Sequence, residues 1–193
     1  MKRMVILVAL LVLSFAANAS DDPSPVVRRV KLPPPEQGAI DLPAPPTWQV
    51  KAERPLAFVA PTVSFIPPEG DAFSVLITIL RNVNDDPDFT HAKTLSKAVA
   101  KKRDLAVEFA TTRHIPILEF QGDQLFGYYF TATDREFTET DREPKPGEWI
   151  YMTSGFAALG DLQLSFTIFS NDPDQPEAAS TLAMLQNARR VDQ

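Results

Sequence analysis

The sequence has no cysteine, and it has two histidines and seven glycines in 193 residues. Without cysteine, the chain can form no disulfide, no thiolate zinc site and no lipid anchor on a cysteine. His91 and His114 are too few for a histidine-rich metal site. The sparse glycines form no phosphate-binding loop, which needs several glycines at fixed spacing. These absences exclude several classes of metal, nucleotide and membrane-anchored site.

Long apolar runs are also missing. The apolar run from Val5 to Ala17 is shorter than the roughly 20 residues of a membrane-spanning helix. Lys2 and Arg3 precede it, and Ala17-Asn18-Ala19 forms a small-x-small site after it. This order is typical of a secretory signal peptide, and an uncleaved anchor is the alternative. We expect residues 1–19 to direct export to the periplasm and to be cleaved after Ala19, leaving no membrane anchor.

Positive charge is in deficit. The chain has 19 Lys and Arg residues against 25 Asp and Glu residues, which gives a net charge of −6. Proteins that bind nucleic acid usually carry a basic patch or stripe, and none is visible here. We therefore expect no nucleic-acid partner.

Proline is abundant in one segment, since residues 20–46 hold eight of the 18 prolines. Proline fixes φ and lacks a backbone donor, so a dense proline tract disfavours helices and central strands. The composition predicts an extended, partly disordered linker over 20–46, followed by one folded domain over 47–190. A proline-rich ligand for a partner is the alternative interpretation, but no clear PxxP-plus-arginine arrangement supports it.

A hairpin over residues 147–170 is the strongest structural signal in the domain. Its second arm alternates between apolar and polar side chains, which is the period of a strand with one buried face. The apolar positions are Leu162, Leu164, Phe166 and Ile168. Gly160-Asp161 supplies the tight turn, because glycine readily adopts a positive φ. We expect this hairpin to form the centre of a sheet, with its apolar face under a helix.

The remaining pattern predicts an α+β fold. Strands are expected at 48–51, 56–66, 72–80, 115–121 and 124–133, and helices at 89–103 and 175–190. This order predicts a single domain with a central antiparallel β-sheet of six to seven strands flanked by two main helices. The strand at 124–133 has aromatic residues on both faces, so it is expected to be covered on both sides or to line a groove.

Acidic residues precede both expected helices. Asn84 to Asp88 is expected to cap the first helix. The alternative, a calcium loop, would require a glycine at the sixth position and a glutamate at the twelfth, and neither is in register. Asp174 and Glu177 have capping-box spacing around Pro176 at the start of the second helix.

The segment Asp134 to Pro146 is a charged connection between two long strands. A connection of this length is unusual for a hairpin, and it is expected to be either functional or mobile. We take residues 134–146 as the region through which a protein partner, if there is one, would bind.

No motif assigns a catalytic, cofactor-binding or metal-binding residue. Ser154-Gly155 lacks the preceding glycine of a nucleophile elbow, and no motif links a serine to His114. Hydrolysis by two carboxylates stays open, since 25 acidic residues offer many pairs. We expect no enzyme and no cofactor.

The pattern resembles the PsbP-like and DcrB-like superfamily of exported proteins over about Leu42 to Arg190. The matching stretches, in order, are LPAPPTWQV, FSVLITIL with the helix around Leu95, GYYFTATDRE, EWIYMTSGF, LQLSFTIFS and AASTLAMLQNARR. The resemblance implies an antiparallel sheet flanked by helices and an accessory or scaffold role in an exported compartment. DcrB-type members are usually lipoproteins, and this chain lacks the cysteine that carries the lipid.

Three functions follow as expectations. The first is a soluble periplasmic accessory or scaffold protein without catalysis, acting through protein contacts. The second is a carrier of a small apolar ligand, suggested by the aromatic strand at 124–133. The third, a hydrolase that uses two carboxylates, is disfavoured because no motif supports it.

Overall fold

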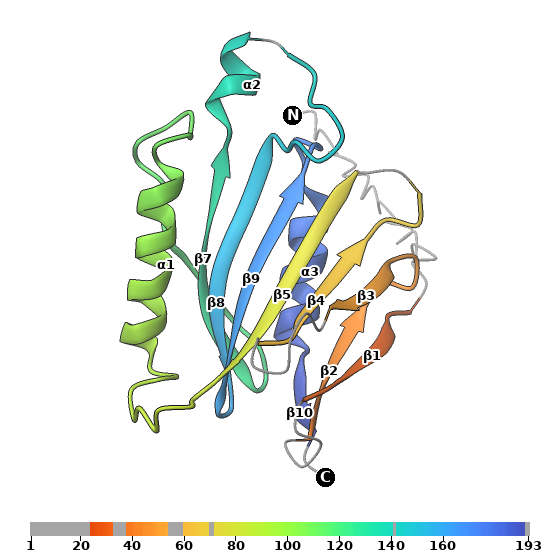
Figure 1. Cartoon of the computed structure of the whole chain (residues 1–193), viewed down its shortest axis with the longest axis vertical. Helices are drawn as coiled ribbons and strands as arrows, with labels where there is room; N and C mark the ends of the chain where they lie inside the picture. The colour runs from red at the N-terminus through yellow and green to blue at the C-terminus, as the bar shows by residue number, and fades with distance from the viewer. Residues whose placement is uncertain (1–23, 33–37, 54–59, 70–71, 141, 192–193) are drawn as a thin grey trace, which may run out of the picture.

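The computed structural model describes residues 24–32, 38–53, 60–69, 72–140 and 142–191, and these form two antiparallel sheets and three helices. The large sheet has seven strands in spatial order (Figure 1): β3 (Gln49–Glu53), β4 (Thr62–Ile66), β5 (Phe73–Arg81), β9 (Leu162–Ser170), β8 (Tyr151–Leu159), β7 (Leu125–Thr133) and β6 (Leu118–Gln121). The small sheet places β2 (Ala39–Ala44) between β1 (Val26–Lys31) and β10 (Arg189–Val191). The helices are α1 (Ala92–Ala106), α2 (Arg135–Thr140) and α3 (Pro176–Gln186).

The predicted antiparallel sheet and its central hairpin are confirmed. Strands β8 and β9 pair over their full length, and Gly160 in the turn has a φ of +59°. All four predicted apolar positions of β9 are at most 1% exposed: Leu162, Leu164, Phe166 and Ile168. β5 is also central, and its residues alternate between buried and partly exposed positions.

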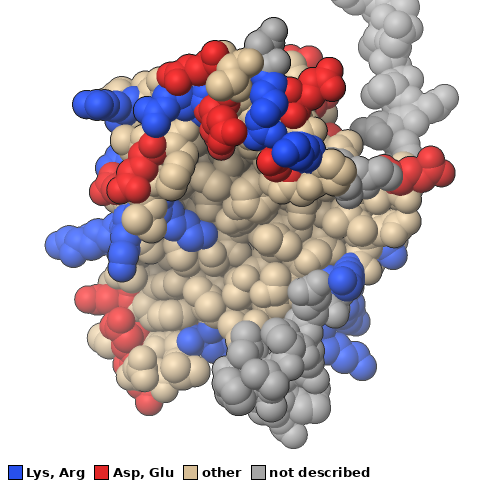
Figure 2. Space-filling view, turned by 45° about the horizontal axis from the view of Figure 1, so that its top comes forward, with Lys and Arg blue, Asp and Glu red and all other residues tan. Residues whose placement is uncertain are grey.

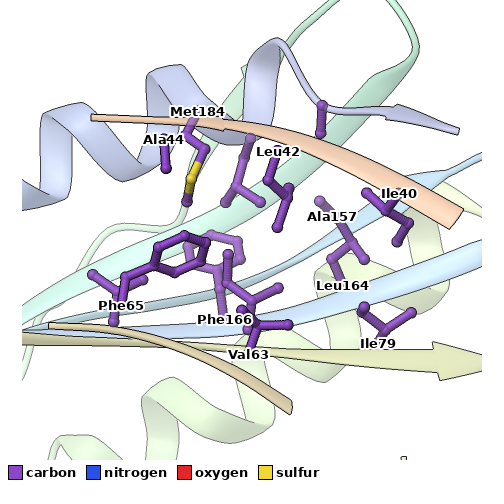
Figure 3. Packing of buried hydrophobic residues seen from close by; sticks show 14 of the residues in the cluster. Ile40, Leu42, Ala44, Val63, Phe65, Ile79, Ala157, Leu164, Phe166 and Met184 are labelled. Carbon is purple, nitrogen blue, oxygen red and sulfur yellow. The ribbon is translucent and has the colours of Figure 1, made fainter. Parts of the chain in front are cut away.

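The buried face of the large sheet lies beneath the small sheet and α3. Figure 3 shows Ile40, Leu42 and Ala44 of β2 pointing toward Val63 and Phe166 of the large sheet. From α3, Met184 and Leu185 join the same cluster and are nearly inaccessible to solvent. Burying a large apolar side chain stabilises the fold by roughly 1.5–3 kcal/mol before entropy is counted. This layer therefore supplies much of the hydrophobic stabilisation.

The expectation of a linker over 20–46 is wrong for its described part. Residues 26–31 and 39–44 are strands, because Ile40, Leu42 and Ala44 alternate along β2 and bury their side chains. Proline is tolerated in β2 because β10 pairs only with residues 39–41, so Pro43 has a strand neighbour on one side alone. The expected signal peptide, residues 1–19, lies outside the described residues.

Helix α1 packs on the opposite face of the large sheet, over β7 and β8. Leu95 and Val99 of α1 are fully buried, and Val99 packs with Phe130 and Ala132 of β7. β7 is thus covered on both faces, as its aromatic residues indicated, since Phe120 and Leu125 belong to the core on the other side. In the described part of the chain, no helix is long and apolar enough to cross a membrane.

The predicted helix caps are wrong. His91 occupies the N-cap of α1 without a side-chain capping bond. The acidic residues before it form a hydrogen bond within their own turn, in which the Asp88 amide donates to Asp86 Oδ1 at 2.9 Å. Gln175 occupies the N-cap of α3 in the left-handed region. Glu177 instead accepts a hydrogen bond from the Ser170 hydroxyl at 3.1 Å. α3 also ends earlier than predicted, because residues 189–191 pair with β2 as β10.

The burial of β2 predicts the effect of shortening one of its side chains. Leu42→Ala should lower the free energy of unfolding by roughly 2–5 kcal/mol, because it leaves a cavity between the two sheets. Val27→Ala on the neighbouring β1 is the control, since Val27 is 58% exposed and should change stability little. Urea denaturation measures both; equal stability of Leu42→Ala and wild type would contradict the placement of β2.

Candidate functional site

The side of the large sheet that carries α1 is only partly covered. Helix α1 lies over β7 and β8, and no described helix or strand lies over the same side of β4, β5 and β9. The strand register places eleven side chains on this part of the sheet, which we call the open face: Thr62, Ser64, Ile66, Ser74, Leu76, Thr78, Leu80, Gln163, Ser165, Thr167 and Phe169. Ser64 and Gln163 are buried, and the other nine are partly exposed. None of them is charged. Figure 2 shows a broad stretch of uncharged residues on this side, with charged side chains gathered mainly along its margins.

A pocket lies at one end of the open face. We call it the aromatic pocket; its volume is about 210 Å³, and its lining residues are Ala106, Phe109, Ala110, Ala132, Thr133, Asp134, Trp149, Ile150, Met152 and Phe169. The lining comes from the end of α1, the end of β7, the segment that enters β8 and the end of β9. Asp134 is the one acidic lining residue, and the other lining side chains are apolar except for Thr133.

Backbone hydrogen bonds fix the walls of the aromatic pocket. The Arg135 amide donates to the Phe109 carbonyl at 2.8 Å, and the Thr111 amide donates to the Thr133 carbonyl at 3.0 Å. The Asp134 amide donates to the Ile150 carbonyl at 2.8 Å. These bonds join the end of α1, the end of β7 and the segment that enters β8 to one another.

Trp149 and Phe169 form an aromatic pair in the pocket wall. Their ring centroids are 6.1 Å apart, and the rings are stacked at 25°. Asn171 holds the segment that carries Trp149: its Oδ1 accepts from the Ile150 amide at 2.9 Å, and its Nδ2 donates to the Glu148 carbonyl at 3.2 Å. Phe109 is 65% exposed on the other side of the pocket.

The charged connection over 134–146 lies beside this pocket, and part of it is the helix α2. Arg142 donates to Glu148 Oε2 at 2.6 Å and to Glu136 Oε1 at 3.0 Å. Its guanidinium also lies 4.6 Å from the centre of the Phe137 ring, which is a cation–π contact. Arg142 therefore ties α2 to the segment that leads to Trp149.

These contacts shift the pKa values of Arg142 and Glu148. The hydrogen bond from Arg142, followed by that from the Lys145 amide, holds the pKa of Glu148 below its ordinary value. The hydrogen bond to Glu148 raises the pKa of Arg142. Both groups are charged at neutral pH, so the link between α2 and residue 148 is ionic.

Lys102 of α1 reaches the border of the open face. Its Nζ donates to Ser165 Oγ at 3.0 Å and to Ser154 Oγ at 3.2 Å, and it lies 4.7 Å from the centre of the Phe156 ring. Burial lowers the pKa of this ammonium group. Among the described residues, no carboxylate forms an ion pair with it.

Two sequence expectations about the site need correction. The aromatic strand over 124–133 is mostly covered by α1 and the core on its two faces. Its last residues, Ala132 and Thr133, line the aromatic pocket, whereas Phe126 and Tyr128 line a different pocket that also contains the polar Glu119 and Gln121. Four pockets lined by described residues each contain one acidic side chain, namely Asp134, Asp41, Asp104 or Glu119. None of these four pockets therefore brings together the two carboxylates that the hydrolase expectation required.

The residues of the aromatic pocket were not singled out by sequence reasoning. Phe109, Trp149 and Phe169 come from three separate segments, and no local motif connects them. The one usable signal was the proximity of Trp149 to the charged connection, which was identified as a region for partner binding.

No family model and no curated protein matches the chain. Among solved structures, the Ran-binding protein Mog1p of Saccharomyces cerevisiae is similar, with 15% identity, a TM-score of 0.46, and coverage of 88% of this chain and 97% of that chain. A mutant of protein Mog1 is similar with 13% identity, a TM-score of 0.45, and coverage of 86% and 97%. Ran binding is stated in the name of the yeast protein and is a property of that protein.

The PsbP-like and DcrB-like resemblance is not borne out: no family model matches the chain, and the solved structures found to be similar are Mog1 proteins. The role of a periplasmic accessory or scaffold protein, which was expected from the signal peptide, the absence of catalytic motifs and that resemblance, is withdrawn as well. The carrier and hydrolase alternatives are also withdrawn. The periplasmic location itself and the absence of catalysis stay predictions.

The Arg142 contacts predict that removing the guanidinium loosens this segment. Arg142→Gln should shift the pKa of Glu148 upward toward its ordinary value and speed proteolysis between α2 and Trp149. Because the folded-state pKa of Glu148 lies below its unfolded value, its stabilisation is present above the unfolded pKa. This stabilisation is lost as pH falls through the folded-state pKa. Carboxyl NMR titration and limited proteolysis measure these effects.

Arg135→Gln is the matched control for this test, since Arg135 lies in the same segment and forms a 3.9 Å ion pair with Glu139. It should leave the pKa of Glu148 unchanged. An unchanged Glu148 titration in Arg142→Gln would show that Arg142 does not hold this carboxylate in solution.

The burial of Lys102 predicts that its charge destabilises the fold. Lys102→Met should raise the free energy of unfolding at neutral pH, because it removes a desolvated charge that no described carboxylate offsets. The folded-state pKa is below the unfolded one, so wild-type stability rises with pH between the two values. The advantage of Lys102→Met should therefore shrink across that alkaline window, as measured by denaturation at several pH values. A less stable variant at neutral pH would contradict this account.

Proposed function

We propose that this chain is a protein-binding domain that takes a large apolar side chain of its partner into the aromatic pocket. The observation that carries the proposal is the placement of Phe109. This aromatic side chain is 65% exposed, yet it lines a pocket whose walls are joined by backbone hydrogen bonds. Exposed aromatic residues beside a surface pocket are typical of interaction sites.

The size of the pocket supports a side chain as its occupant. Sites for small molecules usually enclose roughly 300–1,000 Å³, whereas this pocket encloses about 210 Å³. A single anchoring side chain needs less room than a complete ligand, and such anchors carry much of the affinity of protein interfaces. The volume therefore favours a partner protein over a free metabolite.

The surroundings of the pocket have the polarity expected of an interface. Its lining is mainly apolar, and the neighbouring segment 135–148 supplies exposed charges of both signs, including Arg135, Glu136 and Glu139. An apolar centre with a polar rim is the usual anatomy of protein interfaces.

Within the charged connection 134–146, the proposal gives different roles to different residues. Asp134 lines the pocket directly. Arg142 acts through its contacts with Glu136 and Glu148, which hold the segment leading to Trp149. This segment thus frames the binding site, and the aromatic pocket provides the anchor point.

Random peptides displayed on phage and selected on the full chain test this proposal. Selected peptides should share a large aromatic or aliphatic side chain, and Phe109→Ala should weaken their binding about tenfold or more. Leu118→Ala is the control, because Leu118 is 44% exposed and lies on the opposite face of the sheet. Equal binding to wild type and Phe109→Ala, or the failure to select any peptide, would reject the pocket as a binding site.

A further inference from the structure

Lys102 brings a positive charge to the border of a face whose own side chains are uncharged. Its Nζ contacts only neutral groups among the described residues, namely the hydroxyls of Ser154 and Ser165 and the ring of Phe156. An ammonium group that is partly withdrawn from water normally has an anionic partner or is held for function. The anionic partner of the Lys102 ammonium group is therefore expected on another molecule.

We propose that Lys102 binds a carboxylate of the same partner segment that anchors an apolar side chain in the aromatic pocket. This inference rests on the proposed function and specifies the chemistry of the partner. The partner segment is then an acidic peptide that carries an aromatic or large aliphatic residue close to an Asp, a Glu or a terminal carboxylate.

The distance between the two sites sets the spacing of the partner residues. Ala106 lines the pocket and lies one helical turn after Lys102 on α1, so the two positions are about 6 Å apart along the helix. On the sheet, Phe169 lines the pocket and Thr167 lies two residues away beside Ser154, about 7 Å along the strand. In an extended peptide, side chains two residues apart point to the same side at about this distance. The expected pattern is an apolar residue, any residue, and an acid, in either direction.

One of the two hydroxyl groups beside Lys102 is free to donate a hydrogen bond to a carboxylate. The Ser154 hydroxyl already donates to the Phe166 carbonyl at 3.0 Å. The Ser165 hydroxyl accepts from Lys102, and its own hydrogen is not donated to any described residue. A carboxylate could thus accept one hydrogen bond from Nζ and a second from Ser165.

A carboxylate suits this place better than a phosphate group. Lys102 lies in the C-terminal half of α1 (Ala92–Ala106), where the helix dipole opposes a doubly charged anion. Phosphate sites usually combine several cationic groups or a helix N-terminus, whereas the hydroxyls here are neutral. Burial lowers the pKa of Lys102, and an arriving carboxylate would favour its charged form.

Two synthetic peptides test the inference on the full chain: acetyl-Ala-Trp-Ala-Glu-Ala-amide and the same peptide with Gln in place of Glu. Wild type should bind the Glu peptide about tenfold more tightly, because a charge-assisted hydrogen bond exceeds a neutral one. Lys102→Met should abolish this preference. Lys101→Met should retain it, since Lys101 is the exposed neighbour on the same helix. The reversed order, Glu-Ala-Trp, is measured in the same way, and thermal melts verify that every variant is folded.

The outcomes separate this inference from the proposed function. Equal affinity for the Glu and Gln peptides in both orders, or a preference that persists in Lys102→Met, overturns the role of Lys102. In that case, a loss of binding in Phe109→Ala still supports the aromatic pocket. If no peptide binds in either order, or if binding is insensitive to Phe109→Ala, the pocket and the Lys102 inference fall together.

Discussion

The fold depends on the burial of one face of the large sheet beneath β2 and α3. Phe166 at the centre of β9 is fully buried, and Ile40 and Leu42 close over the same cluster from the small sheet. Neither sheet could bury its apolar side chains alone, because each needs a second layer to exclude water. The N-terminal strands are therefore part of the core.

Because most of the hydrophobic core lies on this one face, the opposite face of the large sheet contributes less to the stability of the fold. Helix α1 covers only β7 and β8 there, and the remaining strands present hydroxyl groups and a few apolar side chains. Where the helix ends, its last residues and the ends of three strands enclose the aromatic pocket. The pocket thus forms because α1 covers only two of the seven strands and ends above the sheet. Arg142 and Asn171 then hold the segment that forms its outer wall.

The sequence predicted those parts of the fold whose signals are local. The alternation from Leu162 to Ile168 and the glycine turn before it identified the central hairpin. β1 and β2 were missed because proline content outweighed the alternation of Ile40, Leu42 and Ala44, although β2 tolerates Pro43 beyond its pairing with β10. The site was missed for a different reason. Phe109, Trp149 and Phe169 meet only through tertiary structure, and Lys102 lies on a helix with several other lysines, so no local pattern distinguishes it.

The position of the small sheet also determines how the molecule can be handled. The described chain begins next to β1 and ends with β10, and both strands flank β2 on the covered side of the large sheet. Residues 24 and 191, at which the described chain begins and ends, therefore lie with the small sheet, on the side opposite the open face and the aromatic pocket. Immobilised through a tag joined directly to residue 24 or residue 191, the protein would present its uncovered face away from the support and toward solution.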